Sequence, residues 1–115
     1  MANTFGQSLR ELRRSKSVSQ RDLAEKVGVD FSYISKLEND RLPPPAADTI
    51  VKICKELDVV PNELLASTGK MPTNVKDMLS TSTAALEFVH QAHDMNLTEE
   101  EWKSLTKRLR RLRSE

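Results

Sequence analysis

The sequence predicts an all-α protein, and its composition and apolar periodicity are the observations that predict it. Aromatic residues make up 4% of the 115 residues and charged residues 30%, a balance that suits helices built on aliphatic side chains better than a sheet. Apolar residues recur at helical spacing between breaks that contain glycine and proline. A chain of this length holds one compact domain and a small appendage. We expect a domain over residues 1–67 and a helical C-terminal region over residues 71–115.

The first helix is expected from Thr4 to about Lys16, because apolar residues fall on one face there. These residues are Phe5, Leu9 and Leu12. Basic side chains occupy the rest of the helix surface, and for some of them a solvated face and contact with phosphate are both open. Those are Arg10, Arg14 and Lys16.

The segment Gln20–Asn39, which reads QRDLAEKVGVDFSYISKLEN, predicts two helices joined by a tight turn. Its apolar residues repeat at helical spacing before and after a break at Gly28-Val29-Asp30. Gly28 is expected to adopt a left-handed conformation that ends the first of these helices. Ser19 and Asp30 are expected to cap the two helices through their side-chain oxygens. The second helix is expected over Phe31–Glu38.

This segment, together with Val18-Ser19-Gln20 and Leu37-Glu38-Asn39, resembles the DNA-binding domain of the Cro and lambda-repressor (XRE-type) helix-turn-helix family. The resemblance covers about Phe5 to Ala66. It implies a five-helix lambda-repressor-like domain, followed here by a small C-terminal helical extension. It also implies a sequence-specific transcriptional regulator, in which the Phe31–Glu38 helix enters the major groove to repress transcription. Asp40 and Asp58 depart from the family, whose members usually carry glycine at these two positions.

The resemblance further implies roles for individual residues. Arg13 would form a structural ion pair with Glu38, at the end of the recognition helix. Gln20, at the start of the preceding helix, would meet a phosphate of the duplex. Asn39 and Arg41 would reach the sugar-phosphate backbone, although Asn39 could instead cap the helix.

One side of the Phe31–Glu38 helix holds the candidate base-reading residues. At about 100° per residue, Ile34 and Leu37 point one way, and polar side chains occupy the opposite direction. The candidates on or near that side are Phe31, Ser32, Ser35 and Lys36. Serine can donate to or accept from base edges, lysine suits guanine or a phosphate, and phenylalanine can pack on a thymine methyl. Tyr33 lies between the two faces, where phosphate contact and partial burial are both open.

Two further helices are expected to close the core of the domain. Leu42-Pro43-Pro44-Pro45 predicts a stiff extended connector, because successive prolines exclude the α region from the residues before them. Apolar residues then predict helices over Ala46–Leu57 and Pro61–Ala66. Cys54 is the only cysteine, which excludes an intramolecular disulfide. Its place in an apolar stripe predicts a buried, structural side chain.

The C-terminal region predicts three more helices, over Pro72–Leu79, from Ser82 to about His93, and after a capping box at Thr98-Glu99-Glu100-Glu101. The last helix carries apolar residues at a 3-4-3 spacing typical of a coiled-coil seam. The residues of this seam are Trp102, Leu105, Leu109 and Leu112. We expect the seam to form a dimer, and docking on the preceding helices is the alternative. The basic residues between 107 and 113 indicate a solvated helix face or a DNA contact.

Several functional classes are not expected from this sequence. The formal net charge of +1 does not by itself indicate nucleic-acid binding, so any basic surface must be local. No apolar run approaches the ~20 residues of a membrane span, and the polar N-terminus predicts a cytoplasmic protein. His90 and His93 lack a supporting ligand, so no metal or cofactor is expected. No nucleophile–base pair or phosphate-binding loop indicates an enzyme.

The expected partners are double-stranded DNA and a second copy of the chain. One recognition helix makes few base contacts, so useful affinity requires a (pseudo)palindromic operator with half-sites ~34 Å apart. The alternative is an antitoxin-like or adaptor module, whose C-terminal helices bind a protein partner. The family resemblance suggests a toxin or a regulatory metallopeptidase as that partner.

Overall fold

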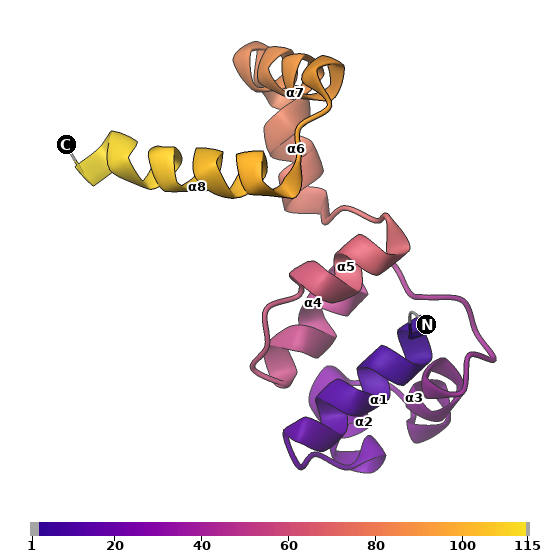
Figure 1. Ribbon diagram of the computed structural model, residues 1–115. Helices are drawn as coiled ribbons and strands as arrows, with labels where there is room; N and C mark the ends of the chain where they lie inside the picture. The colour runs from indigo at the N-terminus through magenta and orange to yellow at the C-terminus, as the bar shows by residue number, and fades with distance from the viewer. Residues whose placement is uncertain (1–2, 115) are drawn as a thin grey trace. The chain divides into compact units, whose positions relative to one another are not determined.

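The computed structural model describes residues 3–114, in which eight helices and no strand are present (Figure 1). The all-α prediction is therefore confirmed for the described part of the chain. The helices are α1 (Phe5–Ser15), α2 (Gln20–Val27), α3 (Phe31–Glu38), α4 (Ala47–Glu56), α5 (Asn62–Thr68), α6 (Thr73–Thr81), α7 (Thr83–Met95) and α8 (Glu99–Ser114). Contacts divide the chain into two units, Met1–Val75 and Lys76–Glu115, which we describe separately.

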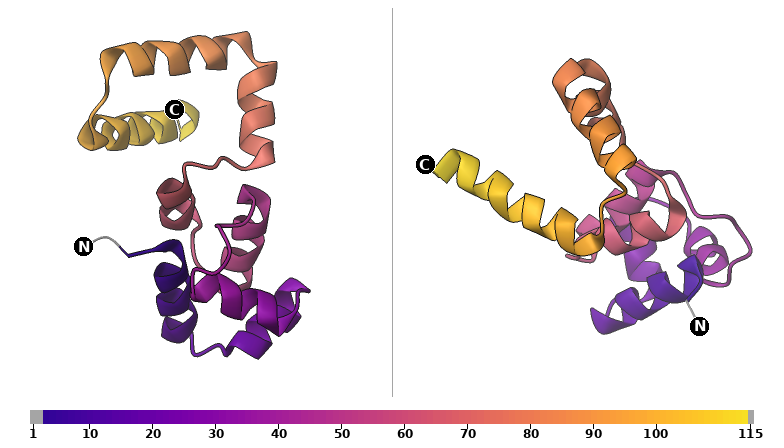
Figure 2. Two further views of the ribbon diagram at one scale, coloured as in Figure 1. Left: turned by 90° about the vertical axis from the view of Figure 1, so that its right-hand side faces the viewer. Right: turned by 45° about the horizontal axis from the view of Figure 1, so that its top comes forward.

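The first unit packs α1 to α5 around a shared apolar core (Figures 1 and 2). One cluster joins α1, α2, α3 and the end of α4, and its fully buried side chains include Leu9, Leu23, Ile34, Leu37, Ile53 and Leu57. A second cluster joins α4 to α5 through Ile50, Cys54 and Leu64. Burying a side chain of this size stabilises the fold by about 1.5–3 kcal/mol. The first of these clusters anchors α3 against α1, α2 and α4.

Cys54 is buried, as its place in the apolar stripe predicts. Burial raises the pKa of the Cys54 thiol, because the surrounding apolar side chains disfavour the thiolate. A thiol in this environment is a poor nucleophile, which supports a structural role.

The turn between α2 and α3 has the predicted conformation at its glycine but not the predicted cap. Gly28 has φ +84°, in the left-handed region, and ends α2. Asp30 occupies the N-cap position of α3, but its side chain makes no capping hydrogen bond, so the prediction for Asp30 is wrong. Backbone bonds hold this turn instead, since the amides of Gly28 and Val29 both donate to the Ala24 carbonyl, at 2.8 and 2.9 Å. Ser19 does cap α2, by accepting a bond from the Asp22 amide at 3.0 Å.

Asp40 links the turn after α3 to the start of α1. Its φ is +56°, and that of Asp58 is +55°, so both aspartates adopt the conformation that explains glycine at these positions in the family. The Asp40 carboxylate accepts bonds from the Thr4 hydroxyl at 2.6 Å and from the Gly6 amide at 3.0 Å. These two bonds help to offset the cost of a left-handed residue that is not glycine.

Gly6 lies where α1 crosses the end of α3. A Cβ at this position would lie 2.4 Å from the Leu37 carbonyl oxygen and 2.6 Å from both the Glu38 carbonyl oxygen and an Asp40 carboxylate oxygen. Only glycine therefore fits this crossing without a shift of the backbone. No motif or spacing in the sequence indicates this role of Gly6.

Most helix ends lie within two residues of those predicted. α5 ends at Thr68 rather than Ala66, because Gly69 at φ +68° is the residue that terminates it. α7 ends at Met95 rather than near His93, because Asn96 at φ +51° takes the left-handed conformation there. The capping box before α8 is present, with the Thr98 and Glu101 side chains each accepting the other's amide, at 3.2 and 3.1 Å.

The second unit has very little core of its own. Ala92 is its one buried residue in the described part of the chain, and several large apolar side chains are exposed. Those of α6 and α7 are Met78, Leu86, Phe88, Val89 and Met95. α7 and α8 diverge from the turn that joins them (Figures 1 and 2). The helices described here include none with the length and apolarity that a membrane span requires.

Candidate nucleic-acid interface

The two sides of α3 differ sharply in burial. Ile34 and Leu37 are at most 1% exposed and anchor α3 in the core, whereas Ser32 and Lys36 are exposed on the opposite side. Phe31, at the start of the helix, is 41% exposed. The structure therefore brings Ser32 and Lys36 to one accessible surface, and Phe31 lies at the flank, beside a different hollow next to the start of α2.

The remaining residues of α3 are less accessible. Ser35 is half-buried, and its carbonyl oxygen accepts a bond from Asn39. Tyr33 is half-buried and packs against the core, which fits the interpretation of partial burial. Tyr33 also lines a shallow hollow beside α3, shared with Ser32, Lys36 and Thr49.

Arg13 and Glu38 form a buried, two-pronged ion pair between α1 and α3. The Arg13 Nε lies 2.6 Å from Glu38 Oε2, and its Nη2 lies 2.9 Å from Glu38 Oε1. The Arg13 and Glu38 side chains are 10% and 0% exposed. Arg13 also donates to the Val18 carbonyl at 3.0 Å, which ties in the loop before α2. This pair fixes the end of α3 to the rest of the domain.

Gln20 and Arg10 extend this ion pair into a network. Gln20 Nε2 donates to Glu38 Oε1 at 3.0 Å, so the Gln20 side chain is half-buried at the start of α2. Arg10 Nε lies 3.4 Å from Glu38 Oε1, and its Nη2 donates to Asn39 Oδ1 at 2.8 Å. The Arg10 guanidinium is therefore bound to Glu38 and Asn39 and is not freely solvated. Glu38 receives donors from three side chains, which compensates the burial of its charge.

Asn39 and Arg41 follow α3 directly. Asn39 Nδ2 donates to the Ser35 carbonyl at 2.9 Å, so Asn39 caps the C-terminal end of α3, as the alternative interpretation proposed. Arg41 is exposed, two residues further along the chain.

The surroundings of Glu38 change its acidity. Burial alone would raise the pKa of Glu38, but hydrogen bonds from Arg13, Gln20 and Arg10, together with the Arg13 charge, lower it below its ordinary value of 4.5. A carboxylate whose pKa is lower in the folded state stabilises the fold above its unfolded pKa. That stabilisation is lost as the pH falls through the folded pKa.

We therefore expect Glu38→Gln to alter the pH dependence of stability. The difference in unfolding free energy between the wild type and Glu38→Gln should be constant above about pH 5 and should narrow below about pH 4. Urea denaturation of both proteins at a series of pH values measures this. A difference that stays the same down to about pH 2 would contradict the assigned role of the Glu38 charge.

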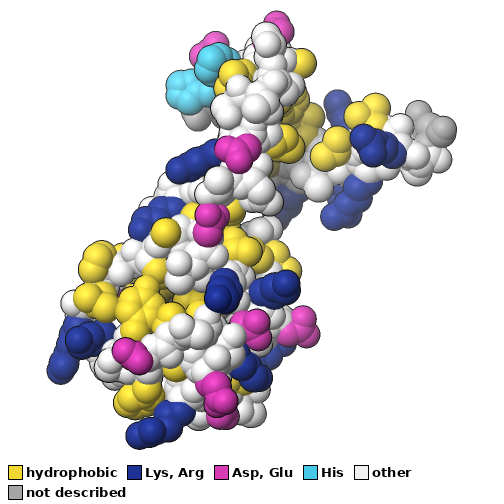
Figure 3. Space-filling view, turned by 180° about the vertical axis from the view of Figure 1, so that it is seen from behind, with side chains coloured by type: hydrophobic (Ala, Val, Ile, Leu, Met, Phe, Trp, Pro, Cys, Tyr) yellow, Lys and Arg dark blue, Asp and Glu magenta, His cyan; other side chains and the backbone are white. Residues whose placement is uncertain are grey.

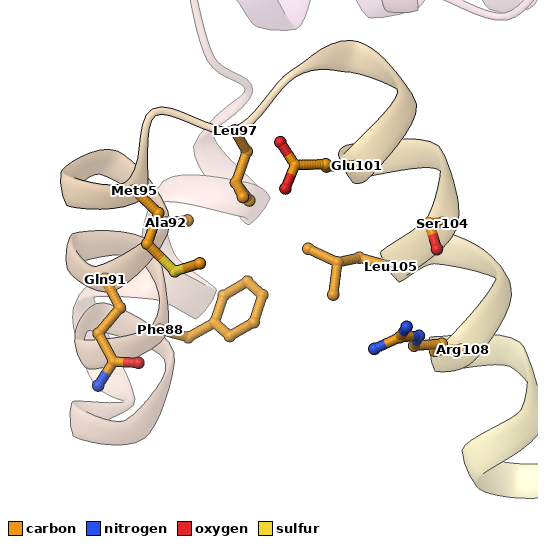
Figure 4. A pocket seen from close by; sticks show the side chains of 9 residues that line it. All are labelled: Phe88, Gln91, Ala92, Met95, Leu97, Glu101, Ser104, Leu105 and Arg108. Carbon is orange, nitrogen blue, oxygen red and sulfur yellow. The ribbon is translucent and has the colours of Figure 1, made fainter.

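The predicted seam residues of α8 lie largely on the surface. Trp102, Leu109 and Leu112 are 40%, 64% and 72% exposed, and Leu105 is half-buried. Figure 3 shows hydrophobic and basic side chains next to one another along α8. Figure 4 shows Phe88 of α7 and Leu105 of α8 pointing toward each other across an apolar groove of about 270 Å³. These residues form an apolar surface that the unit itself leaves largely uncovered.

The two histidines of α7 are exposed. Within the described part of the chain, no three His, Cys, Asp or Glu side chains are grouped so that they could hold a metal ion.

A helix anchored by its inner side, preceded across a glycine turn by a second helix and tied to α1 by a buried ion pair, defines a helix-turn-helix domain of the DNA-binding type. The chain belongs to this family: the family model described as a helix-turn-helix domain matches residues 6–70. The XRE-type resemblance inferred from the sequence is thereby confirmed.

Two curated relatives are transcriptional regulators of Bacillus subtilis (strain 168). The HTH-type regulator RghRB is 40% identical over 65 residues, which cover 56% of this chain and 47% of RghRB. The HTH-type regulator SinR is 37% identical over 61 residues, which cover 53% of this chain and 55% of SinR. The match thus spans about half the length of these relatives.

Solved structures show the same fold. The crystal structure of SinR, the master regulator for biofilm formation, in complex with DNA is 35% identical and covers 54% of this chain and 98% of that chain, with a TM-score of 0.51. The SinR protein/SinI protein complex covers 97% of this chain and 100% of that chain, with a TM-score of 0.52. At 23% identity, this second match shows the fold alone.

Proposed function

We propose that this protein is a sequence-specific DNA-binding transcriptional regulator that inserts α3 into the major groove. The observation that carries the proposal is the exposure of Ser32 and Lys36 on the side of α3 opposite its buried anchor, with Phe31 exposed at the flank. Ser32 and Lys36 contact base edges, and Ser35, which is half-buried, is less accessible to a base. The complex of its relative SinR with DNA supports this assignment.

Contacts with the DNA backbone would come from the residues around α3. Arg41, just after α3, donates to a phosphate, and Asn39 lies between Arg41 and the end of the helix. The start of α2 at Gln20 presents its backbone amides and the positive end of a helix dipole to a second phosphate. The Gln20 side chain is already bonded to Glu38, so we assign this contact to the helix end.

The specificity assignment predicts two different kinds of variant. Ser32→Ala and Lys36→Ala should change the sequences selected from a random DNA pool, since each lost base contact removes about 1–3 kcal/mol of discrimination. Arg41→Ala should weaken binding to all sequences and reduce the salt dependence by about one counterion per half-site. Selection followed by sequencing, and titrations at several salt concentrations, separate the two classes. An unchanged selection profile for Lys36→Ala and Ser32→Ala would refute their role as base readers.

We further propose that the protein binds a pseudo-palindromic operator as a homodimer and acts as a repressor by occupying that operator. A single recognition helix covers one half-site, so a two-fold dimer is needed to read two half-sites ~34 Å apart. The second unit supports this proposal, because it buries almost no side chains and is too small to hold a separate core. We assign the dimer contact to Trp102, Leu105, Leu109 and Leu112 of α8.

The proposed dimer predicts that the two copies of the chain associate more weakly when leucine side chains are removed from the seam. Leu109→Ala combined with Leu112→Ala should shift the protein from dimer to monomer at micromolar concentration, because it removes the two most exposed leucines of the seam. Sedimentation equilibrium measures this, with Lys107→Ala combined with Arg110→Ala as a control on the same helix. A wild-type protein that stays monomeric, with and without operator DNA, would contradict the proposal.

The exposed apolar side chains of α7 and α8 also favour a second candidate, an antitoxin-like or adaptor module. In this case the C-terminal helices hold a protein partner, such as a toxin or a regulatory metallopeptidase, while the first unit tethers the complex to DNA. The second structural match is to a complex of SinR with the protein SinI, although it supports only the fold. Purification from the native host separates the two candidates. The adaptor candidate predicts that the protein is recovered with a stoichiometric protein partner and that the regulator itself is monomeric.

A further inference from the structure

Arg21 and Phe31 form a contact between α2 and α3 that joins two exposed residues. The Arg21 Cζ lies 4.7 Å from the centroid of the Phe31 ring, within the range of a cation–π interaction. Arg21 is the second residue of α2 and Phe31 is the first residue of α3. Within the described part of the chain, the contact with Phe31 is the one interaction of the Arg21 side chain. The N–H donors of this guanidinium are therefore available to a ligand.

The Arg21–Phe31 contact lies at the edge of a shallow basic hollow. This hollow has a volume of about 520 Å³ and is lined by Arg10, Arg13, Arg14, Ser19, Gln20, Arg21 and Phe31. Arg13 and Arg10 share the single negative charge of Glu38, and Arg10 also donates to the neutral Asn39 side chain. Arg14 and Arg21 have no hydrogen-bond or carboxylate partner for their guanidinium groups among the described residues, so the hollow carries excess positive charge. It offers two free guanidinium groups next to the start of a helix.

We propose that this hollow binds a backbone phosphate of duplex DNA, with Arg21 as a donor and Phe31 as the residue that positions Arg21. The proposal rests on the proposed function. In docked helix-turn-helix domains the helix before the recognition helix crosses the DNA backbone, and the N-terminal end of the recognition helix enters the groove. The Arg21–Phe31 contact joins those two elements. It gives Phe31 a positioning role in place of the thymine-methyl contact expected from the sequence.

The location of this hollow favours phosphate over a base edge as its ligand, because α2 is the helix that crosses the DNA backbone in docked helix-turn-helix domains. A guanidinium presents its donors in a planar fork that matches two phosphate oxygens. A free arginine side chain loses rotamer entropy when it is ordered on binding, and the Phe31 ring removes part of that loss in advance. The benefit of Phe31 should therefore depend on the presence of Arg21.

A double-mutant cycle on DNA affinity tests this dependence. The probe is a labelled duplex of one fixed mixed sequence, titrated at several salt concentrations. Arg21→Ala should weaken binding about tenfold, as expected for a lost charge-assisted hydrogen bond, and reduce the salt slope by about one per half-site. Phe31→Leu keeps every charge and should weaken binding about threefold, because it releases the Arg21 side chain. The double variant should bind no more weakly than Arg21→Ala alone.

Three further variants complete the experiment. Phe31→Tyr retains an aromatic ring and should bind DNA with the affinity of the wild type. Lys55→Ala removes an exposed cation near the end of α4 and should leave the salt slope unchanged. Arg21→Lys retains the charge and should keep the salt slope while losing part of the affinity. Thermal unfolding of each variant should match the wild type, because both side chains of the contact are exposed.

Different results would overturn the proposed function and the proposed phosphate site. A wild-type protein with no affinity for any duplex at low ionic strength overturns the proposed function. If the wild type binds and Arg21→Ala has the same salt slope as the wild type, the phosphate site is wrong. If Phe31→Leu weakens binding equally with and without Arg21, the positioning role of Phe31 is wrong.

Discussion

Glu38→Ala is expected to lower the free energy of unfolding of the first unit by about 3–5 kcal/mol, because it leaves the buried Arg13 guanidinium without its partner. The loss is large since Arg13 Nε lies 2.6 Å from a carboxylate whose side chain is 0% exposed. Gln20 and Arg10 lose an acceptor in the same variant. Domains of this size have a total stability of about 5–15 kcal/mol, so the variant should be partly unfolded under mild conditions.

Urea denaturation followed by far-ultraviolet circular dichroism measures this effect. Glu25→Ala is the matched control, because it removes an exposed glutamate from α2. DNA affinity of Glu38→Ala should fall in proportion to the unfolded fraction, since Glu38 holds α3 in place and does not face the duplex. A fully folded Glu38→Ala protein, as stable as Glu25→Ala, would show that the network does not anchor α3.

Gly6→Ala is expected to lower the unfolding free energy by about 2 kcal/mol or more, through overpacking at the crossing of α1 and α3. The added Cβ would lie 2.4 Å from the Leu37 carbonyl oxygen and 2.6 Å from that of Glu38. Both are backbone atoms, so α3 must shift to relieve the clash. Without a clash, alanine in place of glycine inside a helix would stabilise it by about 0.8–1.0 kcal/mol, so the two effects have opposite signs.

The sign of the change in unfolding free energy therefore shows whether the clash outweighs the gain in helix propensity. Urea denaturation of Gly6→Ala is compared with Ser8→Ala, which adds helix propensity to α1 without a predicted clash. Because α3 must move, Gly6→Ala should also weaken binding of any duplex, even under conditions where it is folded. A variant that is more stable than the wild type would contradict the close approach of α1 to α3.

The local features of the first unit could be predicted from the sequence, because each depends on residues close together in the chain. The left-handed turn at Gly28 and the bounds of α3 follow from the spacing of apolar residues around a glycine. The cap by Asp30 was wrong because N-cap preference is statistical: the aspartate occupies the N-cap position, but its side chain makes no bond there.

The contacts that fix α3 in the domain could not be predicted in the same way. Gly6 meets Leu37, and Asp40 meets Thr4, across more than thirty residues of sequence. Arg21 and Phe31 are ten residues apart on different helices, so no helical periodicity places them together. Arg13 and Glu38 were paired only through the family resemblance, because their spacing alone gives no sign of a contact.

Selection of bound duplexes from a random pool by the wild-type protein shows whether the exposed side of α3 reads a DNA sequence. We expect enrichment of one short motif, repeated with two-fold symmetry at a spacing of about one helical turn, ~34 Å. Recovery of DNA without any enriched motif, or no retention of duplex at low ionic strength, would contradict this role of α3.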